Sequence, residues 1–238
     1  MSASFPTREE VEWLESLPDG SDHLAPDREL ITEPELSLSA TALFVNVFLT
    51  HGILLCLLVV AAFFAAIPAS AFGVAVSVET VAVGIGFGLV LAVVNTVAGL
   101  VAERYGYAPS ERLRGLLTPE TAGGWLLLLG GTLPLVAGFE EFLFRGVLIG
   151  VFAAGFDAAP WALAVVSSVA FAFAHESQGA VGVVVTGLLG LLLAGGYILT
   201  ESLVVVVVAH YLVNAVELVF FEGLGGGGEQ GGPATPHR

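Results

Sequence analysis

The sequence G-F-E-E-F-L-F-R-G, at residues 138–146, places two carboxylates and a guanidinium in one of the most apolar parts of the chain. An ionised side chain at the centre of a bilayer costs from about 2.5 to over 10 kcal/mol, so intramembrane charge indicates a functional site. Glu141 and Arg145 are four residues apart, so on a helix they share a face and can neutralise each other. Glu140 lies about 100° around the helix. It therefore lacks that partner and is free for chemistry.

The composition is that of a membrane protein. The 238 residues are 56% hydrophobic and 12% charged, and the mean hydropathy is +0.90. Several apolar runs reach the length of about 20 residues that a spanning helix needs. All seven basic residues are arginines and the net charge is −15. This acidic, lysine-free composition is typical of proteins from halophilic archaea, and it excludes nucleic acid as a partner because phosphate binding needs clustered Lys and Arg. The single cysteine, Cys56, excludes a disulfide framework and a cysteine-based zinc site.

We predict an all-α integral membrane protein, a bundle of six or seven transmembrane helices around a polar cavity, with membrane lipids as partners. The predicted segments are an acidic, mostly flexible N-terminal segment (1–40), two transmembrane helices (41–102), a polar loop (103–122), a helical core (123–222) and a disordered glycine-rich tail (223–238). The number of spans depends on the apolar run 124–156, which is too long for one straight span. Gly130, Gly131 and Pro134 favour a kink or a break in it.

The polar loop also predicts the orientation in the membrane. It contains Arg104, Arg112 and Arg114, and loops rich in basic residues lie on the cytoplasmic side. Two preceding spans then place the N-terminus in the cytoplasm of a multi-pass cell-membrane protein. Labelling of residue 110 from outside intact cells would contradict this orientation.

Two glycines and two polar residues within the first two spans predict how these helices pack. Gly84 and Gly88 form a G-x-x-x-G pair, which favours close helix packing. His51 and Asn95 are expected to form hydrogen bonds to neighbouring helices.

Two further polar groups lie in the apolar helices that follow Glu140. The first is F-A-F-A-H, residues 171–175, which ends one helix. The second is His210 with Asn214, four residues apart and mid-way through the last helix. Glu217 shares the face of His210 and Asn214 and could support them. Each residue alone could be an ordinary buried polar group. Together they predict one shared cavity, because polar groups in a low-dielectric medium must find one another.

A carboxylate, two imidazoles and a carboxamide are suited to activating water. Glu140 could act as general base, and His175 could hold the water, carry a proton or bind a metal. His210 and Asn214 offer N–H donors that could stabilise an oxyanion. The pair His175-Glu176 does not belong to an H-E-x-x-H zinc motif, because Gly179 stands where the second histidine should be.

The ordered set E-E-x-x-x-R at 140–145, F-x-x-x-H at 171–175 and H-x-x-x-N at 210–214 resembles the CPBP family of intramembrane endopeptidases. This family comprises type II CAAX prenyl endopeptidases and bacteriocin-processing or self-immunity proteins, and the resemblance covers about residues 123–222. It implies a glutamate-dependent peptidase that cleaves a membrane-anchored or prenylated CAAX-type peptide in a cavity open to the cytoplasm. The residues that it implies are catalytic Glu140, Glu141, His175, His210 and Asn214, with structural support from Arg145 and Phe171.

Three alternatives remain open from the sequence. Members of this family are often called metalloproteases, and Glu140, His175 and His210 could hold zinc or could work without it. An ion- or proton-coupled transporter would also place Glu, Arg and His within the membrane, although no inverted repeat is visible. The third alternative is a non-catalytic membrane scaffold.

Overall fold

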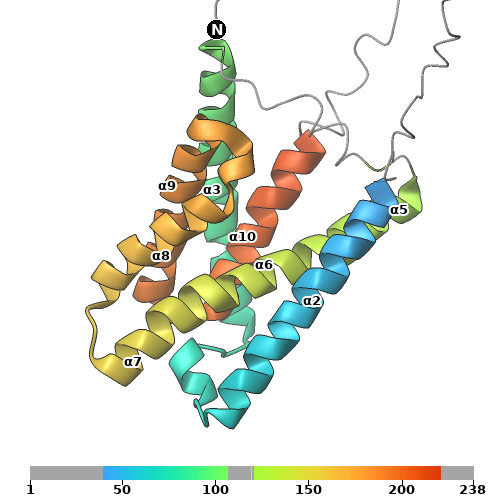
Figure 1. Cartoon of the computed structure of the whole chain (residues 1–238). Helices are drawn as coiled ribbons and strands as arrows, with labels where there is room; N and C mark the ends of the chain where they lie inside the picture. Colours follow the sequence, from blue (N-terminus) through green and yellow to red (C-terminus); the bar gives the residue numbers. More distant parts are fainter. Residues whose placement is uncertain (1–39, 107–118, 120, 221–238) are drawn as a thin grey trace, which may run out of the picture. The chain divides into compact units, whose positions relative to one another are not determined.

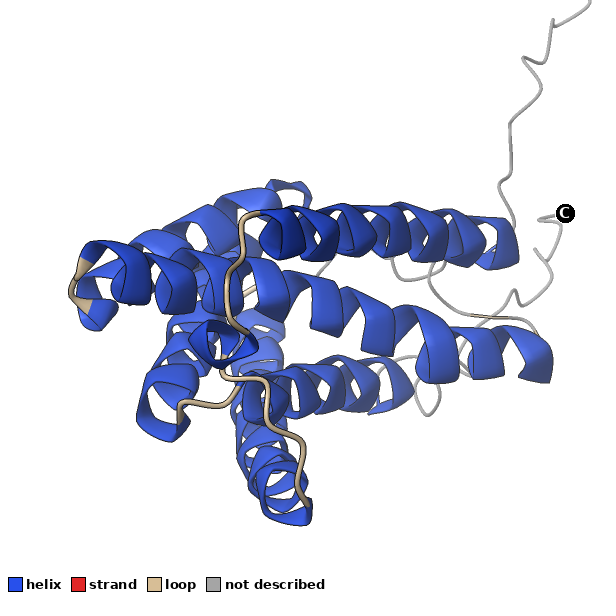
Figure 2. Ribbon diagram, turned by 90° about the horizontal axis from the view of Figure 1, so that it is seen from below, coloured by secondary structure: helices blue, strands red, loops and turns tan. Residues whose placement is uncertain are grey.

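The computed structural model describes residues 40–106, 119 and 121–220, apart from the side chains of residues 40 and 103. The predictions for both termini and for Arg112 and Arg114 lie outside these residues. Within the described ranges every regular element is helical (Figure 2), which agrees with the predicted all-α class.

The first two helices are close to the predicted spans. α2 covers Ala40–Phe64 and α3 covers Val78–Arg104. Between them, Pro68 has extended backbone angles (φ −69°, ψ 144°) and precedes the short 3₁₀ turn η2, Ala69–Phe72. A proline disfavours helical geometry in the residue before it, which explains why α2 ends ahead of this point.

The apolar run that contains Glu140 is one continuous helical segment. It consists of α5 (Ala122–Leu127), the π-helical turn η3 (Leu128–Thr132), α6 (Leu133–Glu141), the π-helical segment η4 (Phe142–Val151) and α7 (Phe152–Phe156). Of the two predicted possibilities near Pro134, a kink or a break, the break does not occur. The N–H of Leu133 bonds to the carbonyl of Leu128, five residues back, so the helix is widened just where the proline ring would otherwise meet a carbonyl four residues earlier.

The remaining helices lie within the predicted helical core, residues 123–222. α8 covers Pro160–Ala174, the 3₁₀ turn η5 covers Glu176–Gln178, α9 covers Gly179–Thr200 and α10 covers Leu203–Leu218. The hydroxyl of Ser202 caps α10 by accepting the N–H of Val205 at 3.4 Å.

The described residues do not establish six or seven spans. Among the described residues, three helices are long and apolar enough to cross a membrane: Thr41–Phe64, Val78–Ala102 and Glu176–Thr200. α8 and α10 have 15 and 16 residues, fewer than the about 20 that a straight span requires. These two short apolar helices carry the histidine motifs. The number of spans therefore depends on whether α8 and α10 cross the membrane.

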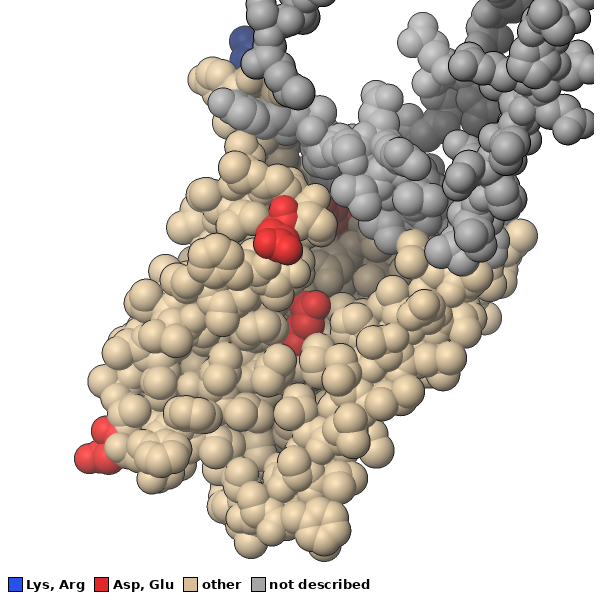
Figure 3. All heavy atoms as spheres, in the orientation of Figure 1, with Lys and Arg blue, Asp and Glu red and all other residues tan. Residues whose placement is uncertain are grey.

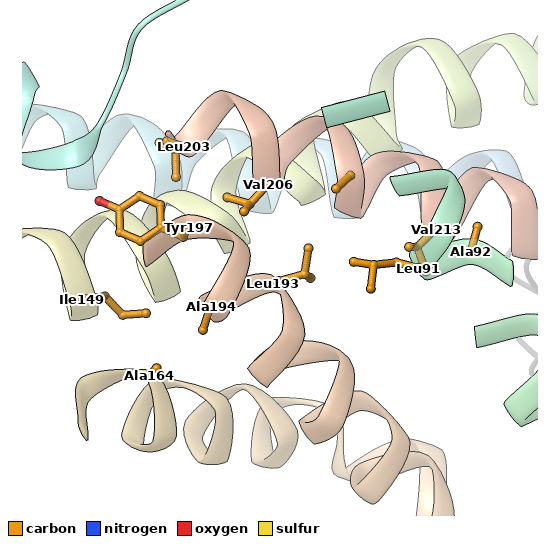
Figure 4. Close-up of a cluster of buried hydrophobic side chains, with 11 residues drawn as sticks. Leu91, Ala92, Ile149, Ala164, Leu193, Ala194, Tyr197, Leu203, Val206 and Val213 are labelled. Carbon is orange, nitrogen blue, oxygen red and sulfur yellow. The ribbon is translucent and has the colours of Figure 1, made fainter. Parts of the chain in front are cut away.

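Within residues 38–238, α10 is the central helix (Figure 1). It packs against α3, α6 and α9, while α8 packs on α9 and η4, and α2 packs on α6. The main buried cluster joins α3, η4, α8, α9 and α10 through small and branched apolar side chains such as Leu91, Ile149, Ala164, Leu193 and Val206 (Figure 4). Close packing of this kind is what stabilises helix contacts in a bilayer. It fixes α10 between the helices that carry the other motifs.

The G-x-x-x-G prediction is confirmed at the contact between α3 and α10. A Cβ atom on Gly84 would lie 2.9 Å from Cβ of Val208, and one on Gly88 would lie 2.8 Å from Cα of Ala209. Only glycine permits this approach. The contact places α3 directly behind the turn of α10 that carries His210.

Of the two hydrogen-bond predictions for the first two spans, one is confirmed and one is wrong. Asn95 on α3 donates to Oε2 of Glu217 on α10 at 2.9 Å, so its predicted interhelical bond is confirmed. The prediction for His51 is wrong, because its Nδ1 lies 2.9 Å from the carbonyl of Val47 in its own helix. Its ring instead meets the edge of Phe139, with 5.1 Å between centroids.

Candidate active site

The predicted site residues come from four elements. Glu140 and Glu141 end α6, and Arg145 follows in η4. Phe171 is in α8, and His175 is the first residue after the end of α8. His210 and Asn214 are in α10. Charged side chains are sparse on the face of the molecule that Figure 3 shows. An acidic side chain there lies in a hollow between uncharged side chains. The structure brings all of these residues except Asn214 into one connected network of contacts.

Glu141 lies at the centre of a closed cluster. Its Oε1 lies 2.8 Å from NH1 of Arg145 and 2.7 Å from Nδ1 of His210, and the Glu141 and Arg145 side chains are both 0% exposed. The predicted Glu141–Arg145 pair is therefore confirmed. A buried pair of this kind needs further hydrogen bonds to offset desolvation. NH2 of Arg145 donates to the carbonyl of Gly190 at 2.7 Å.

Phe171 connects the charged groups to the histidines. Its ring lies 4.7 Å from Cζ of Arg145, a distance at which the ring face attracts a cation. The ring centroids of His175 and His210 lie 4.6 and 5.8 Å away. Phe171 therefore contacts the guanidinium and both imidazoles and limits where each can move.

Glu140 faces the more open side. Its side chain is 13% exposed, and its two oxygens face different histidines: Oε1 lies 3.9 Å from Nε2 of His175, and Oε2 lies 3.6 Å from Nε2 of His210. Both distances are longer than a direct hydrogen bond between these atoms. One water can bond to Glu140 and His175 together, since two contacts of about 2.8 Å close a triangle on a 3.9 Å base.

The partners of the ring nitrogens assign the proton positions. Nδ1 of His175 lies 2.8 Å from the carbonyl oxygen of Phe171, which can only accept, so this nitrogen carries the hydrogen. Nδ1 of His210 faces the Glu141 carboxylate at 2.7 Å and is a donor for the same reason. Both rings therefore direct Nε2 toward Glu140, and a neutral ring offers a lone pair there.

Asn214 lies one turn after His210 but outside this network. It is half-buried, and its side chain has no hydrogen bond within the described part of the chain. Glu217, expected to support the face of His210 and Asn214, accepts from Asn95 on α3. The role of Asn214 as an oxyanion donor therefore stays a prediction.

Two residues that the sequence analysis did not single out complete the site. Gly190 supplies the carbonyl for Arg145, and a Cβ on it would lie 3.0 Å from Cδ1 of Phe171. Ser167 donates to the carbonyl of Phe144 at 2.7 Å. Ser167 could have been found from its spacing, because Phe171 follows four residues later. Gly190 could not, because the chain has 30 glycines.

The candidate zinc ligands Glu140, His175 and His210 do not form a metal site in this geometry. Donors to tetrahedral zinc lie about 2.0–2.2 Å from the ion, so pairs of them lie about 3.4 Å apart. Glu140 comes within 3.6 and 3.9 Å of the two histidines. Even so, no set of three His, Cys, Asp or Glu among the described residues has an arrangement that could hold an ion. No step in the chemistry below is assigned to a metal.

A protein-family model matches the part of the chain that carries the three motifs. Residues 122–216 match the family model of the type II CAAX prenyl endopeptidase Rce1-like proteins, which confirms the resemblance carried by the three motifs. Neither curated proteins nor solved structures give a match. The matched segment contains every predicted site residue, whereas α2 and α3 lie outside it.

Proposed function

We propose that this protein is an intramembrane endopeptidase, because residues 122–216 match the family model of the Rce1-like type II CAAX prenyl endopeptidases. It hydrolyses a peptide bond of a membrane-associated substrate such as a prenylated CAAX-type peptide. The observation that carries the proposal is the position of Glu140, a partly exposed carboxylate among apolar helices that faces Nε2 of two histidines. The family match favours a peptidase over a transporter or a scaffold, and the apolar spans favour the cell membrane as its location.

In the first step, Glu140 removes a proton from water while the water oxygen bonds to the carbonyl carbon of the substrate. His175 directs the water, because its fixed Nδ1–H leaves the Nε2 lone pair to accept the second hydrogen. The C–N bond then breaks, and the proton held by Glu140 passes to the leaving amine. Glu140 thus acts first as base and then as acid.

His210 and Asn214 stabilise the oxyanion that forms in this step. Since Nδ1–H of His210 is directed at Glu141, Nε2 can donate to an oxyanion only if the ring is an imidazolium. The charges then balance: Glu140 and Glu141 contribute −2, and Arg145 and His210 contribute +2. A neutral sum favours burial of this cluster in a low-dielectric medium. In this mechanism Glu141 holds the cationic His210 and does not touch the substrate.

The test is cleavage of a farnesylated CAAX peptide by the purified full-length protein in detergent. Glu140→Gln should reduce turnover by at least about 10²–10⁴-fold, the range of general acid–base catalysis. Its melting temperature should change little, because the amide is nearly isosteric. Glu176→Gln, an exposed carboxylate next to His175, is the matched control and should cleave normally. Wild-type turnover by Glu140→Gln would refute the proposal.

A further inference from the structure

Two residues of α8 and the residue that caps its C-terminus form one stripe facing the helix that carries Glu140. Ser167, Phe171 and His175 follow each other at four-residue intervals and so lie on one face. Ser167 is fully buried, and Phe171 is buried against Arg145. His175 faces Glu140. The mechanism above uses Phe171 and His175 but assigns nothing to Ser167.

The hydrogen bond of Ser167 crosses between helices. Its Oγ donates to the carbonyl of Phe144 at 2.7 Å. Phe144 lies in the π-helical segment η4, between Glu141 and Arg145. Ser167 therefore connects α8 to the backbone of η4. The last turn of α6, directly before η4, carries Glu140 and Glu141.

We propose that Ser167 is a positioning residue for the hydrolysis. Its bond fixes the register of α8 along α6 and η4, and thereby the separation of 3.9 Å between Nε2 of His175 and Oε1 of Glu140. The inference rests on the proposed function of Glu140 and His175.

His175 has little freedom to compensate if this register changes. Its Nδ1 is bonded to the carbonyl of Phe171 in its own helix, so the ring moves with α8. Eight residues of helix span about 12 Å and transmit a displacement from Ser167 to His175. Misplacement by about 1 Å from a remote site can reduce a rate by about 10²-fold.

The neighbouring residue provides a matched control. Ser168 is also buried, and its Oγ donates at the same distance, 2.7 Å, to the carbonyl of Ala164 in its own helix. Ser168→Ala and Ser167→Ala each remove one buried hydroxyl and one hydrogen bond. Only Ser167→Ala removes a bond between α8 and η4, so loss of stability alone affects the two variants alike.

The experiment measures kcat, KM and melting temperature with the farnesylated CAAX peptide. Ser167→Ala should lower kcat by about 10- to 100-fold with KM nearly unchanged, whereas Ser168→Ala should keep the wild-type kcat. Ser167→Cys fills the same space with a weak donor and should behave as Ser167→Ala, which covers the case in which the alanine variant does not fold. Equal kcat values for the Ser167 and Ser168 variants would overturn the inference.

A second measurement needs no substrate. The chain has five histidines, so the ring signal of His175 can be assigned by NMR with a His175→Ala variant. It should shift in Ser167→Ala and Ser167→Cys but not in Ser168→Ala, and an unshifted signal would refute the inference. Cleavage by Glu140→Gln at the wild-type rate would instead refute the proposed function, so the two failures are distinguishable.

Discussion

Glu140 and Glu141 are adjacent in the sequence but lie in different surroundings. The closed cluster, Glu141 with Arg145 and His210, has contacts of 2.7 and 2.8 Å and no exposure at either member of its ion pair. The open cluster, Glu140 with His175 and His210, has contacts of 3.6 and 3.9 Å, and Glu140 is 13% exposed. One step along a helix thus separates a carboxylate that balances charge from a carboxylate that can reach water. The closed cluster should govern stability and the open cluster turnover.

The largest effect is expected from breaking the closed cluster. Arg145→Ala leaves Glu141 buried with one cationic partner fewer and leaves the Gly190 carbonyl without its donor. Removing one member of a buried ion pair costs about 3–5 kcal/mol. Thermal and denaturant unfolding in detergent should show this loss in Arg145→Ala and nearly none in Glu140→Gln.

Arg145→Lys refines this measurement. Lysine keeps the charge but lacks the planar fork that reaches both Glu141 and Gly190. Its stability should therefore lie between those of the wild type and Arg145→Ala. If Arg145→Ala folded normally while Glu140→Gln did not, the roles of the two clusters would be reversed.

The second effect separates the two donors on α10. His210→Ala and Asn214→Ala should each reduce turnover by about 10²–10³-fold, as for loss of an oxyanion donor. Only His210→Ala should also lower stability, because His210 contacts Glu141 whereas Asn214 has no side-chain hydrogen bond among the described residues. Turnover and unfolding of both variants, measured together, check this difference.

Elemental analysis of the same preparations tests the assignment of His210. Metal content should be equal in the wild type, His210→Ala and Asn214→Ala. Stoichiometric zinc that disappears in His210→Ala would make His210 a metal ligand and would overturn its role as oxyanion donor.

The sequence predicted the parts of this site that depend on spacing along one helix. The four-residue interval between Glu141 and Arg145 predicts their ion pair, and the pair is present. The interval between Gly84 and Gly88 predicts close packing, which the contact with α10 confirms. Such local predictions hold because the geometry of a helix fixes which side chains share a face.

The sequence did not predict which atoms of the site meet between helices. His210 meets Glu141 through Nδ1 and Glu140 through Nε2, which follows only from how α10 packs on α6. The π-helical turns before Pro134 and after Glu141 differ from α-helix by one residue per hydrogen-bonded turn and leave no periodic pattern of their own. The bond of His51 to its own helix was missed because a backbone acceptor one turn away is available to any helical histidine.

The smallest effect is expected at α3, outside the segment that matches the family. A Cβ on Gly88 would lie 2.8 Å from Cα of Ala209, next to His210, whereas a Cβ on Gly86 would meet nothing within 4 Å. Gly88→Ala must displace the backbone of α10, and overpacking of this kind costs about 1–3 kcal/mol. Since His210 belongs to both clusters, the displacement should lower stability and turnover together, while Gly86→Ala should change neither appreciably. Unfolding and cleavage measured on both variants decide the point: equal behaviour of the two would mean that α3 does not set the position of His210.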